Sequence, residues 1–565
     1  MVPAEVTVPR PERRTDRRPS DALRAFGHRY RVPLLATLPT VPLYAVWWAF
    51  LATGGGDLAA QDAWAHFASR HGSSAYGLFW YGGMHTANYS VISPYLMAAL
   101  GVRTVTVVSG LAASWLAAVL TVRAGVRTPL WPALLASLAL WCNVASGRTT
   151  FALGVAFALA ACVLLTRERR LFLAAAYSAL ATMASPVAGL FLAVVGAAFL
   201  LVRDWGRALV LLVPPAAVVG LTTLLFPFTG EQPMAADRIW PPALLGLAVA
   251  VLAPRTWRIA RWSGAVYAVG TVLTYLIASP VGTNVERFAE LFAPAVLLAA
   301  LLGAPGLTGP HPPLPRFAPS WLTAPRLRRL VCGLLVVALV YSVGWVGKKT
   351  VDDLRVSTVV PAWAAETEGV VRALDGLGAD RTRVEVVPAR NHREAVGLAP
   401  HVNMARGWNR QLDVERGRLF YDGTFSAATY RAWLDRWAVG FVVLPLGRPD
   451  GPAEEEAALV RDPDLRPDWL EPVWQDEHWQ VYRVRDAVPL VSAPGTVVTT
   501  TSTDLVLRAD RPGPVTVRVA WSPWLRTDGG CLTRDGEFTR LTVPAPGEYR
   551  ISSRYGPSPT ARDHC

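Results

Sequence analysis

The sequence predicts an α-helical polytopic membrane protein with about 11 transmembrane helices and an extracytoplasmic C-terminal region that combines an α/β domain with a β-sandwich. Hydrophobic residues make up 52% of the 565 residues, and charged residues only 17%. A soluble protein of this size carries about 25% charged residues. Apolar segments alternate with short Arg-containing connections as far as residue 346, and no later segment is long enough to span a bilayer. The chain therefore divides into a membrane part and a polar part.

The N-terminal residues 1–32 are polar and Arg-rich, and no apolar segment begins before Leu34. This stretch is too long and too charged for the front of a cleaved signal peptide. We expect it to be a cytoplasmic tail.

The transmembrane domain is predicted over residues 33–347, since a membrane helix needs roughly 20 mainly apolar residues. The candidate segments are 34–53, 103–122, 129–145, 148–166, 171–184, 187–202, 208–226, 242–254, 262–279, 286–303 and 329–346. The run 171–202 is broken at Ser185-Pro186, so it forms either two short spans or a single kinked one.

Basic residues set the expected orientation, because Arg-rich connections belong on the cytoplasmic side. They crowd the connections 123–128, 167–170, 203–207, 255–261 and 304–328, and are sparse in 54–102, 146–147, 185–186, 227–241 and 280–285. The pattern predicts a multi-pass plasma-membrane protein with a cytoplasmic N-terminus and an extracytoplasmic C-terminus. The lipid bilayer is its expected surrounding, and the net charge of +13 gives no reason to expect a nucleic-acid partner.

The polar part is predicted to hold two extracytoplasmic domains, an α/β domain over 348–487 and a β-sandwich over 488–565. In the first, 361–375 and 425–437 have helical composition, while 383–388, 441–445 and 479–484 look like strands. In the second, short alternating segments are separated by Pro-Gly turns, which is typical of a sandwich. Cys531 and Cys565 are able to pair if this region lies outside the cell.

The first external loop, residues 54–102, has an unusual composition for a connection between membrane helices. Asp57 and Asp62 follow the first apolar run, and three histidines and several Trp and Tyr residues come after them. Residues 57–69 and 88–101 are expected to form two juxtamembrane helices lying in the interface. Ionisable and aromatic residues gathered at a membrane surface indicate a reaction or a binding event there.

Three sequences carry a resemblance to a known group of proteins: GGGDLAAQD at 54–62, CNVASGRTTF at 142–151 and GTNVERFAELFAP at 282–294. With the overall architecture, they resemble the GT-C superfamily of polytopic membrane glycosyltransferases. Within it, the chain is similar to actinobacterial cell-envelope arabinofuranosyl- and mannosyltransferases. Many GT-C families have two adjacent acidic residues after the first span, whereas Asp57 and Asp62 are five positions apart. This departure leaves the choice of base open.

The resemblance implies transfer of a sugar from a polyprenyl-phosphate donor to an extracytoplasmic cell-envelope glycan. An acidic residue of the first external loop would be the general base, with Asp57 as the first choice and Asp62 as the second. Arginine suits the leaving phosphate because it binds oxyanions with two parallel hydrogen bonds. The expected phosphate ligands are Arg287, Arg148 and Arg103, assisted by His85, and the expected substrate ligands are Trp80, Tyr81, Tyr89 and Glu286.

Each of these residues also has a structural interpretation. Asp57 is well placed to be a helix N-cap, and Asp62 with His66 forms a plausible surface pair four positions apart. Arg287 lies beside Glu286 and Glu290 and is able to form a local ion pair, while the aromatic residues of 76–89 fit an interfacial belt.

A metal site is not indicated, because His66 and His71 are five positions apart and do not share a helix face. We expect no cofactor, and leave a divalent metal open. Two other classes of function remain: a secondary transporter, which predicts related halves and charges near the middle of the membrane, and a non-enzymatic membrane-anchored protein for glycan binding or assembly.

Overall fold

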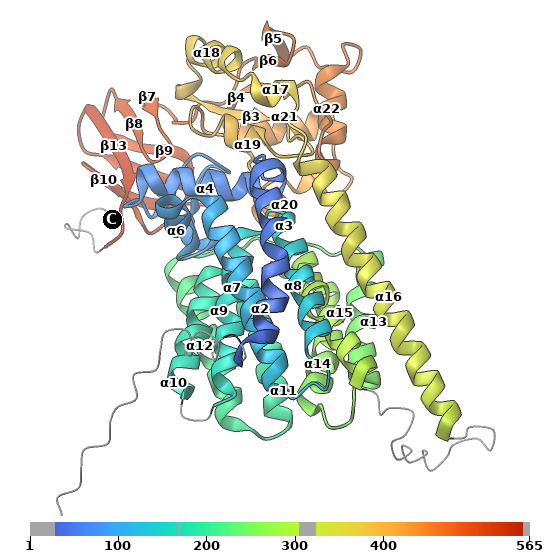
Figure 1. The fold of residues 1–565 in the computed structure, drawn as a ribbon. Helices are drawn as coiled ribbons and strands as arrows, with labels where there is room; N and C mark the ends of the chain where they lie inside the picture. Colours follow the sequence, from blue (N-terminus) through green and yellow to red (C-terminus); the bar gives the residue numbers. More distant parts are fainter. Residues whose placement is uncertain (1–26, 28, 168–169, 304–323, 557–565) are drawn as a thin grey trace, which may run out of the picture.

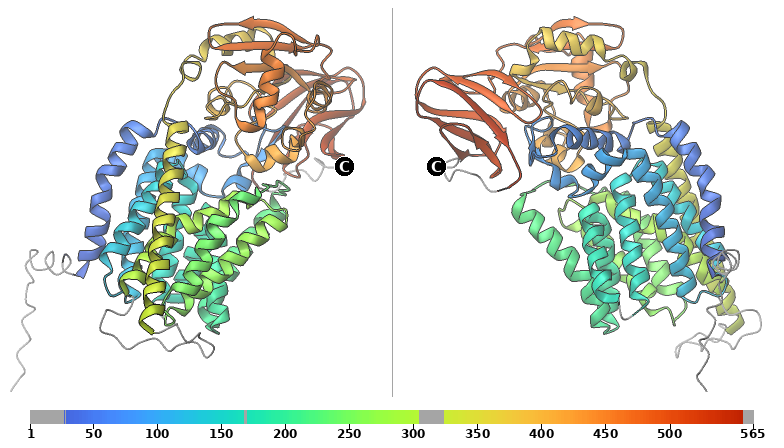
Figure 2. Two further views of the ribbon diagram at one scale, coloured as in Figure 1. Left: turned by 90° about the vertical axis from the view of Figure 1, so that its right-hand side faces the viewer. Right: turned by 60° about the vertical axis from the view of Figure 1, so that its left-hand side comes forward.

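The computed structural model describes residues 27, 29–167, 170–303 and 324–556. A bundle of apolar helices forms one end of the molecule, and an α/β unit and a β-sandwich lie at the other (Figure 1). Figure 2 shows the sandwich to one side of the α/β unit, next to the end of the bundle. We call this end of the bundle the domain end. The predicted N-terminal tail falls almost entirely outside the described residues, as does Cys565, so the tail and the pairing with Cys531 stay predictions.

Each of the eleven predicted apolar segments is helical. The first consists of α2 (Arg31–Thr37), η1 (Leu38–Thr40), α3 (Val41–Val46) and η2 (Trp47–Leu51). The others are α7 (Val102–Arg123), α8 (Leu130–Ala145), α9 (Thr149–Leu165), α10 (Leu171–Ala184), α11 (Pro186–Leu201), α12 (Trp205–Leu225), α13 (Trp240–Leu252), α14 (Arg258–Leu276), α15 (Glu286–Gly303) and α16 (Ala324–Ser357). Among the described residues, four helical stretches are long and apolar enough to cross a membrane: 31–51, 102–123, 205–225 and 325–357. The count of eleven spans remains a prediction.

The run 171–202 forms two helices and not one. Ser185, between α10 and α11, has an extended backbone with φ −154° and ψ 117°. The following Pro186 has no N–H group and disfavours helical geometry in the residue before it, so α10 ends there.

The connections with few basic residues lie at the domain end. The Ser90 hydroxyl donates a hydrogen bond to the Ala184 carbonyl at 2.8 Å, which places the α10–α11 turn against the 54–102 loop. From the α/β unit, Gln411 Nε2 donates to the Pro280 carbonyl at 3.0 Å. This arrangement separates the two sets of connections, as the charge pattern requires, and the side of the membrane on which each set lies stays a prediction.

The first and second long helices pack closely at one glycine. A Cβ atom built on Gly110 of α7 would lie 2.3 Å from the hydroxyl oxygen of Tyr44. Tyr44 is buried in the first helical segment, so the contact between these two elements depends on the absence of a side chain at position 110.

The 54–102 loop contains α4 (Asp57–His71), β1 (Tyr76–Gly77), β2 (Met84–His85), α5 (Thr86–Tyr89) and α6 (Ser93–Leu100). Helix α4 lies across the domain end of the bundle (Figure 1). We expected α4 to lie in the membrane interface, and its apolar residues are covered by protein. Leu58 packs against the bundle, while Trp64 and Phe67 belong to a core cluster with Val384 and Val386 of the α/β unit. Helix α4 is therefore covered on both sides by protein.

The α/β unit begins later than predicted, because α16 continues as a helix to Ser357 and not to 346. Its helices are α17 (Ala362–Ala365), α18 (Glu368–Gly376), η6 (Ala379–Arg381), α19 (Glu394–Gly397), α20 (Arg410–Arg416), η7 (Arg418–Phe420), α21 (Ala427–Arg436), η8 (Gly451–Ala453) and α22 (Glu454–Arg461). Its strands are β3 (Arg383–Val386), β4 (Val439–Pro445), β5 (Leu470–Gln475) and β6 (Trp479–Val484), in the order β3-β4-β6-β5. The β3–β4 pair is parallel and the others are antiparallel.

The β-sandwich has two antiparallel sheets. Its strands are β7 (Gly495–Thr500), β8 (Leu505–Ala509), β9 (Gly513–Ala520), β10 (Leu525–Thr527), β11 (Cys531–Asp535), β12 (Phe538–Val543) and β13 (Gly547–Ser553). The sheet orders are β10-β13-β8-β7 and β11-β12-β9. Alternating residues such as Leu505 and Leu507 fill the core between the sheets, and Tyr76 and Leu78 of the 54–102 loop join that core. The loop is therefore built into the sandwich as well as into the α/β unit.

Candidate active site

Charged side chains from four elements meet at the domain end of the bundle. Asp57 is the first residue of α4, Arg148 precedes α9, Glu286, Arg287 and Glu290 lie in the first turns of α15, and Lys349 and Asp353 lie near the end of α16. Intramembrane or interfacial ionisable groups are costly to bury without partners. Each of these groups is therefore expected to have a partner of opposite charge.

Asp57 is not the N-cap of α4, although its composition fits that role. The N-cap is Gly56, with φ 65° and ψ −137°, and no side chain caps the helix. The Asp57 carboxylate is 33% exposed and lies 3.4 Å from Arg148 Nε and 3.6 Å from Arg287 Nη2. Both contacts are made by the same oxygen, Oδ2. Within the described residues, no hydrogen bond or ion pair reaches Oδ1.

Arg148 is held by three carboxylates. Besides Asp57, its Nη1 lies 3.0 Å from Glu290 Oε2 and its Nη2 lies 3.1 Å from Asp353 Oδ2. Each nitrogen of the guanidinium group thus has a carboxylate partner, and the side chain is only 12% exposed. Arg148 fixes the relative positions of α4, α9, α15 and α16.

Arg287 has more free hydrogen-bonding capacity. Its Nη2 lies 3.6 Å from Asp57 Oδ2, and its guanidinium carbon lies 5.3 Å from the ring centre of Phe151. The side chain is 20% exposed. Because Nε and Nη1 have no ion pair among the described residues, Arg287 can bind a further anion.

Lys349 closes the inner side of the network. Its ammonium group binds Glu286 and Glu290, and Arg238 Nη1 lies 3.7 Å from Glu286 Oε2. A small cavity beside Arg148, Glu290 and Asp353 has a volume of about 10 Å³, which is about the space of one water molecule. That volume is too small for a sugar or a phosphate group. Asp57, 33% exposed, and Arg287, 20% exposed, form an accessible edge of the network.

Tyr89 borders this edge. Its ring stacks on Trp64 with centroids 5.6 Å apart, and its hydroxyl group accepts a hydrogen bond from Gln61 Nε2. Burial, followed by the nearby Asp57 charge, raises the pKa of Tyr89 well above its ordinary value. Tyr89 is therefore a neutral hydrogen-bonding group next to Asp57.

Asp62 and Arg103 lie elsewhere. Arg103 Nη2 donates a hydrogen bond to the Ala52 carbonyl at 2.6 Å. Burial raises the pKa of Asp62 to about 6, and the charges of Arg103 and Arg393 oppose this rise. The structure thus separates the two candidate bases, and Arg103 accompanies Asp62 and not Asp57.

Three of the predicted ligands are buried in the folded core. Trp80 is 0% exposed and Tyr81 1%, and both pack between α4 and the α/β unit. His85 is 3% exposed, with Nδ1 2.9 Å from the Ala75 carbonyl and Nε2 3.2 Å from Ser522 Oγ of the sandwich. The expectation that Trp80 and Tyr81 stack on a sugar and that His85 assists the phosphate does not fit these positions. The C-terminal units cover the aromatic residues that an interfacial belt would expose.

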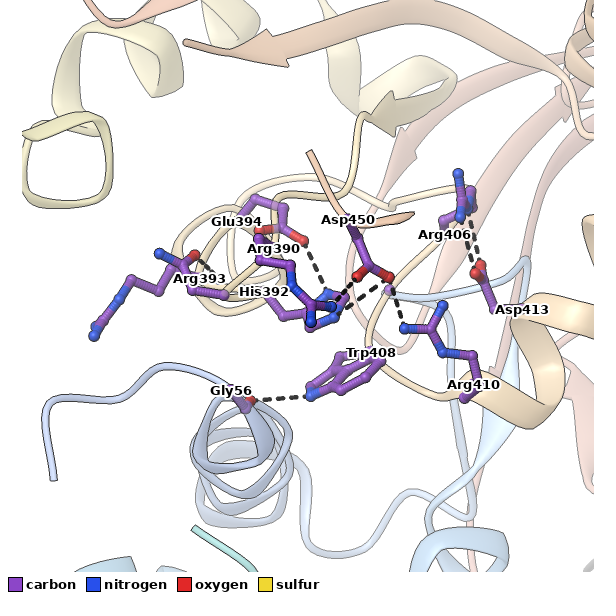
Figure 3. Close-up of polar contacts among 12 residues, drawn as sticks. Gly56, Arg390, His392, Arg393, Glu394, Arg406, Trp408, Arg410, Asp413 and Asp450 are labelled. Carbon is purple, nitrogen blue, oxygen red and sulfur yellow. Dashed lines mark hydrogen bonds and ion pairs between the residues drawn. The ribbon is translucent and has the colours of Figure 1, made fainter. Parts of the chain in front are cut away.

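The α/β unit holds the residue that precedes Asp57. Gly56 N donates to the Asn391 carbonyl at 2.8 Å, and Trp408 Nε1 donates to the Gly56 carbonyl at 3.0 Å. Figure 3 shows Trp408 above the start of α4, with the ring of His392 stacked on it. The ring centroids are 3.5 Å apart and the planes differ by 14°. Both polar groups of the Gly56 peptide are therefore bound by the α/β unit.

A network of charged residues surrounds His392 and Trp408. Asp450 accepts hydrogen bonds from Arg390 Nη1 at 3.0 Å and from Arg410 Nη2 at 2.6 Å, and lies 3.8 Å from His392 Nε2 (Figure 3). The Arg410 guanidinium carbon is 5.1 Å from the Trp408 ring centre. Arg410 and His392 thus fix the orientation of the indole ring.

Comparison with known proteins yields a weak structural likeness. No protein-family model and no curated protein sequence matches the chain. Among solved structures, a crystal structure of the Archaeoglobus fulgidus oligosaccharyltransferase, tethered with an acceptor peptide containing the NVT sequon via a disulfide bond, is similar with a TM-score of 0.41 and 11% identity. The match covers 74% of this chain and 70% of that chain.

Sequence reasoning missed Lys349 and Asp353, and treated Glu290 only as a neighbour of Arg287. Lys349 and Asp353 follow the last apolar run, where the span was expected to end at 346. Their spacing of four residues matches that of Glu286 and Glu290, which places each pair on one helix face. That shared spacing was the available signal, and so was the rarity of lysine in this chain.

Proposed function

We propose that the protein is a membrane glycosyltransferase that moves a sugar from a polyprenyl-phosphate donor to an extracytoplasmic cell-envelope glycan. The observation that supports this most directly is the environment of Asp57. One carboxylate oxygen is oriented by two guanidinium groups, and the other is free to accept a proton. A partly exposed base beside a cation with spare donors is the pair of groups that this reaction needs.

The proposed role of Asp57 is that of general base. Its Oδ1 accepts the proton of an acceptor hydroxyl group. At the same time, the oxygen of that hydroxyl group attacks the anomeric carbon of the donor. The bond between the anomeric carbon and the phosphate oxygen breaks, and the electron pair leaves with the polyprenyl phosphate. A positioned base of this kind contributes roughly 10²- to 10⁴-fold to the rate.

The proposed phosphate ligand is Arg287. Arg148, which was also expected to bind the phosphate, has a different proposed role. Arg287 keeps free N–H groups that can bind two phosphate oxygens at once. The three guanidinium nitrogens of Arg148 form ion pairs with Asp57, Glu290 and Asp353, so its proposed role is to orient the base. Glu286, bound by Lys349 and 2% exposed, supports the network from inside and does not face substrate.

The position of the charges favours this proposal over a secondary transporter. Transporters place their substrate and ion sites near the middle of the bilayer, at discontinuous helices. Here Asp57 and Arg287 lie at the first residues of their helices, at the domain end. A non-enzymatic role predicts instead that the Asp57 carboxylate is dispensable, which the following experiment tests.

Two matched variants separate the candidate bases, Asp57→Asn and Asp62→Asn. Membranes containing the full chain would be incubated with a panel of radiolabelled polyprenyl-phosphate sugars and an extracted cell-envelope glycan. We expect Asp57→Asn to lose about 10²-fold or more of the transfer rate, and Asp62→Asn to change it by less than tenfold. Equal amounts of each variant in the membrane fraction make the rates comparable.

The outcomes discriminate between the alternatives. Loss of transfer in Asp62→Asn alone would move the base to Asp62, and unchanged transfer in both variants would contradict the enzymatic proposal. Binding of radiolabelled polyprenyl phosphate without a sugar tests Arg287 separately. Arg287→Gln should weaken that binding about tenfold or more, while Arg258→Gln, at the opposite end of the bundle, should leave it unchanged.

A further inference from the structure

A second site lies at the other end of α4, between its last turn and the sandwich. A cavity of about 440 Å³ is enclosed there by Arg70 and His71, by the loop before β8 and by strands β10 and β13. This volume is in the range of pockets that bind small molecules. At about 1.5 Å per residue, Arg70 lies roughly 20 Å along the helix from Asp57.

The lining of this cavity is polar throughout. It consists of Arg, His, Ser, Thr and Asp residues, with no aliphatic side chain and no Phe, Tyr or Trp among them. The cavity therefore offers no aliphatic side chain to a lipid chain, and no Phe, Tyr or Trp ring on which a neutral sugar would stack. Hydroxyl and guanidinium groups are instead suited to a hydroxyl-rich ligand that carries an oxyanion.

The charges of the lining are unbalanced, with four arginines against two aspartates. Arg550 binds Asp504 through Nη2 at 3.0 Å, and Arg526 Nη2 donates to the backbone carbonyls of Arg554, at 3.3 Å, and Gly556. Among the described residues, Arg70 and Arg554 have no ion pair. Two guanidinium groups, one from the end of α4 and one from the end of β13, are therefore available to a ligand.

The two walls are joined in a fixed geometry. The hydroxyl oxygens of Ser74 and Ser553 are 2.7 Å apart, and Tyr76 N donates to Ser553 Oγ at 2.9 Å. Ser74 and Ser553 are both buried. The backbone segments that carry Arg70, four residues before Ser74, and Arg554, next to Ser553, are therefore held together by these contacts.

We infer that this cavity binds an acidic sugar unit, with a carboxylate or phosphate group held by Arg70 and Arg554 and ring hydroxyls held by the serine and threonine side chains. That the sugar belongs to the acceptor glycan rests on the proposed function. In that case α4 connects the two sites, with the acid group bound at its last turn and the reacting hydroxyl at its first residue.

Binding to the full chain in detergent, measured by calorimetry, tests this inference without a transfer assay. The probes are tri-galacturonic acid, glucose 6-phosphate and maltotriose. We expect at least one acidic probe to bind, with affinity that falls as salt rises, and maltotriose to bind at least tenfold more weakly. Binding of only one acidic probe identifies the oxyanion as carboxylate or phosphate.

Charge-matched variants locate the site. Arg70→Gln and Arg554→Gln should each weaken binding about tenfold or more, while Arg511→Gln, an exposed arginine of the sandwich outside the cavity, should not change it. Equal binding of neutral and acidic probes, absence of binding, or unchanged binding in both cavity variants would each overturn the inference. Asp57→Asn should bind the acidic probe as the natural chain does. The binding result can therefore be interpreted even if the transfer proposal fails.

Discussion

Asp57 and Asp62 lie five residues apart on α4, and their different surroundings give them different chemistry. Asp57 faces Arg148 and Arg287 at an exposed edge. Asp62 points toward the Thr53–Gly54 backbone, 3.4 Å from where a Cβ of Gly54 would lie. A carboxylate buried with little compensation favours its protonated form, so Asp62 is the poorer candidate for a base that works while ionised.

The raised pKa of Asp62 predicts a pH dependence of stability. With a folded-state pKa of about 6 against the ordinary 3.8, the folded protein binds this proton more tightly than the unfolded chain. The contribution of Asp62 to the free energy of unfolding therefore falls as pH rises from about 4 to about 6. Relative to the natural chain, Asp62→Asn should have a similar apparent Tm at pH 4 and a higher one at pH 7.

Thermal unfolding in detergent between pH 4 and pH 8 checks this prediction. Asp510→Asn, at an exposed position of the sandwich, is the control and should shift the apparent Tm equally at every pH. A difference between Asp62→Asn and the natural chain that stays constant with pH would contradict the assignment.

At the scale of single residues, the sequence predicted the positions of charged residues that lie at the ends of apolar segments. Asp57 follows the first apolar run and Arg287 begins another, so both could be placed at one surface. Trp80 and Tyr81 could not be placed in the same way. Aromatic residues next to polar ones look alike whether they meet lipid or protein. Trp80 and Tyr81 are buried in a cluster that includes Val384 and Val386, which are distant in the sequence.

At the scale of elements, apolar length predicted where each bundle helix begins more reliably than where α16 ends. Helix α16 continues past its apolar run because Lys349 and Asp353 find partners on α15 and Arg148. Such tertiary partners are not visible in hydropathy, so the helix was cut short at 346. The position of α4 could not be predicted for the same reason. Its composition fits a helix in the membrane interface, and its packing between the bundle and the α/β unit depends on contacts with distant segments.

The contact between α7 and the first helical segment gives a prediction about packing. Gly110→Ala should destabilise the protein, because the new methyl group meets the buried Tyr44 hydroxyl and overpacking costs about 1–3 kcal/mol. Gly333→Ala on α16 is the matched control, since no atom lies within 4 Å of a Cβ there. We expect a lower apparent Tm for Gly110→Ala and an equal or higher one for Gly333→Ala, because alanine favours a helix over glycine. Equal effects of the two variants would exclude the close contact.

At the scale of the whole molecule, the alternation of basic and non-basic connections predicted two opposite ends, and the structure separates them accordingly. The sandwich followed from its short alternating strands and Pro-Gly turns. What the sequence could not show is that the 54–102 loop supplies Tyr76 and Leu78 to the sandwich core. Contacts between residues hundreds of positions apart leave no local pattern.

The orientation of the two ends in the membrane is a prediction that cysteine labelling tests. Thr424→Cys lies at an exposed site of the α/β unit, and Arg127→Cys at an exposed site between α7 and α8, at the opposite end of the bundle. An impermeant maleimide added to intact cells should label the first variant and not the second, above the background of the natural chain. Permeabilised cells should show both, and the reverse pattern in intact cells would invert the topology.

The hydrogen bonds of Gly56 to Asn391 and Trp408 have a consequence for the timing of biogenesis. The groups that hold Gly56 are translated more than 300 residues after it. Domains fold largely in the order of synthesis, so the bundle is in the bilayer well before Gly56 is held. On the proposed mechanism, the nascent protein stays inactive until the segment that contains Asn391 and Trp408 has been translated and has folded.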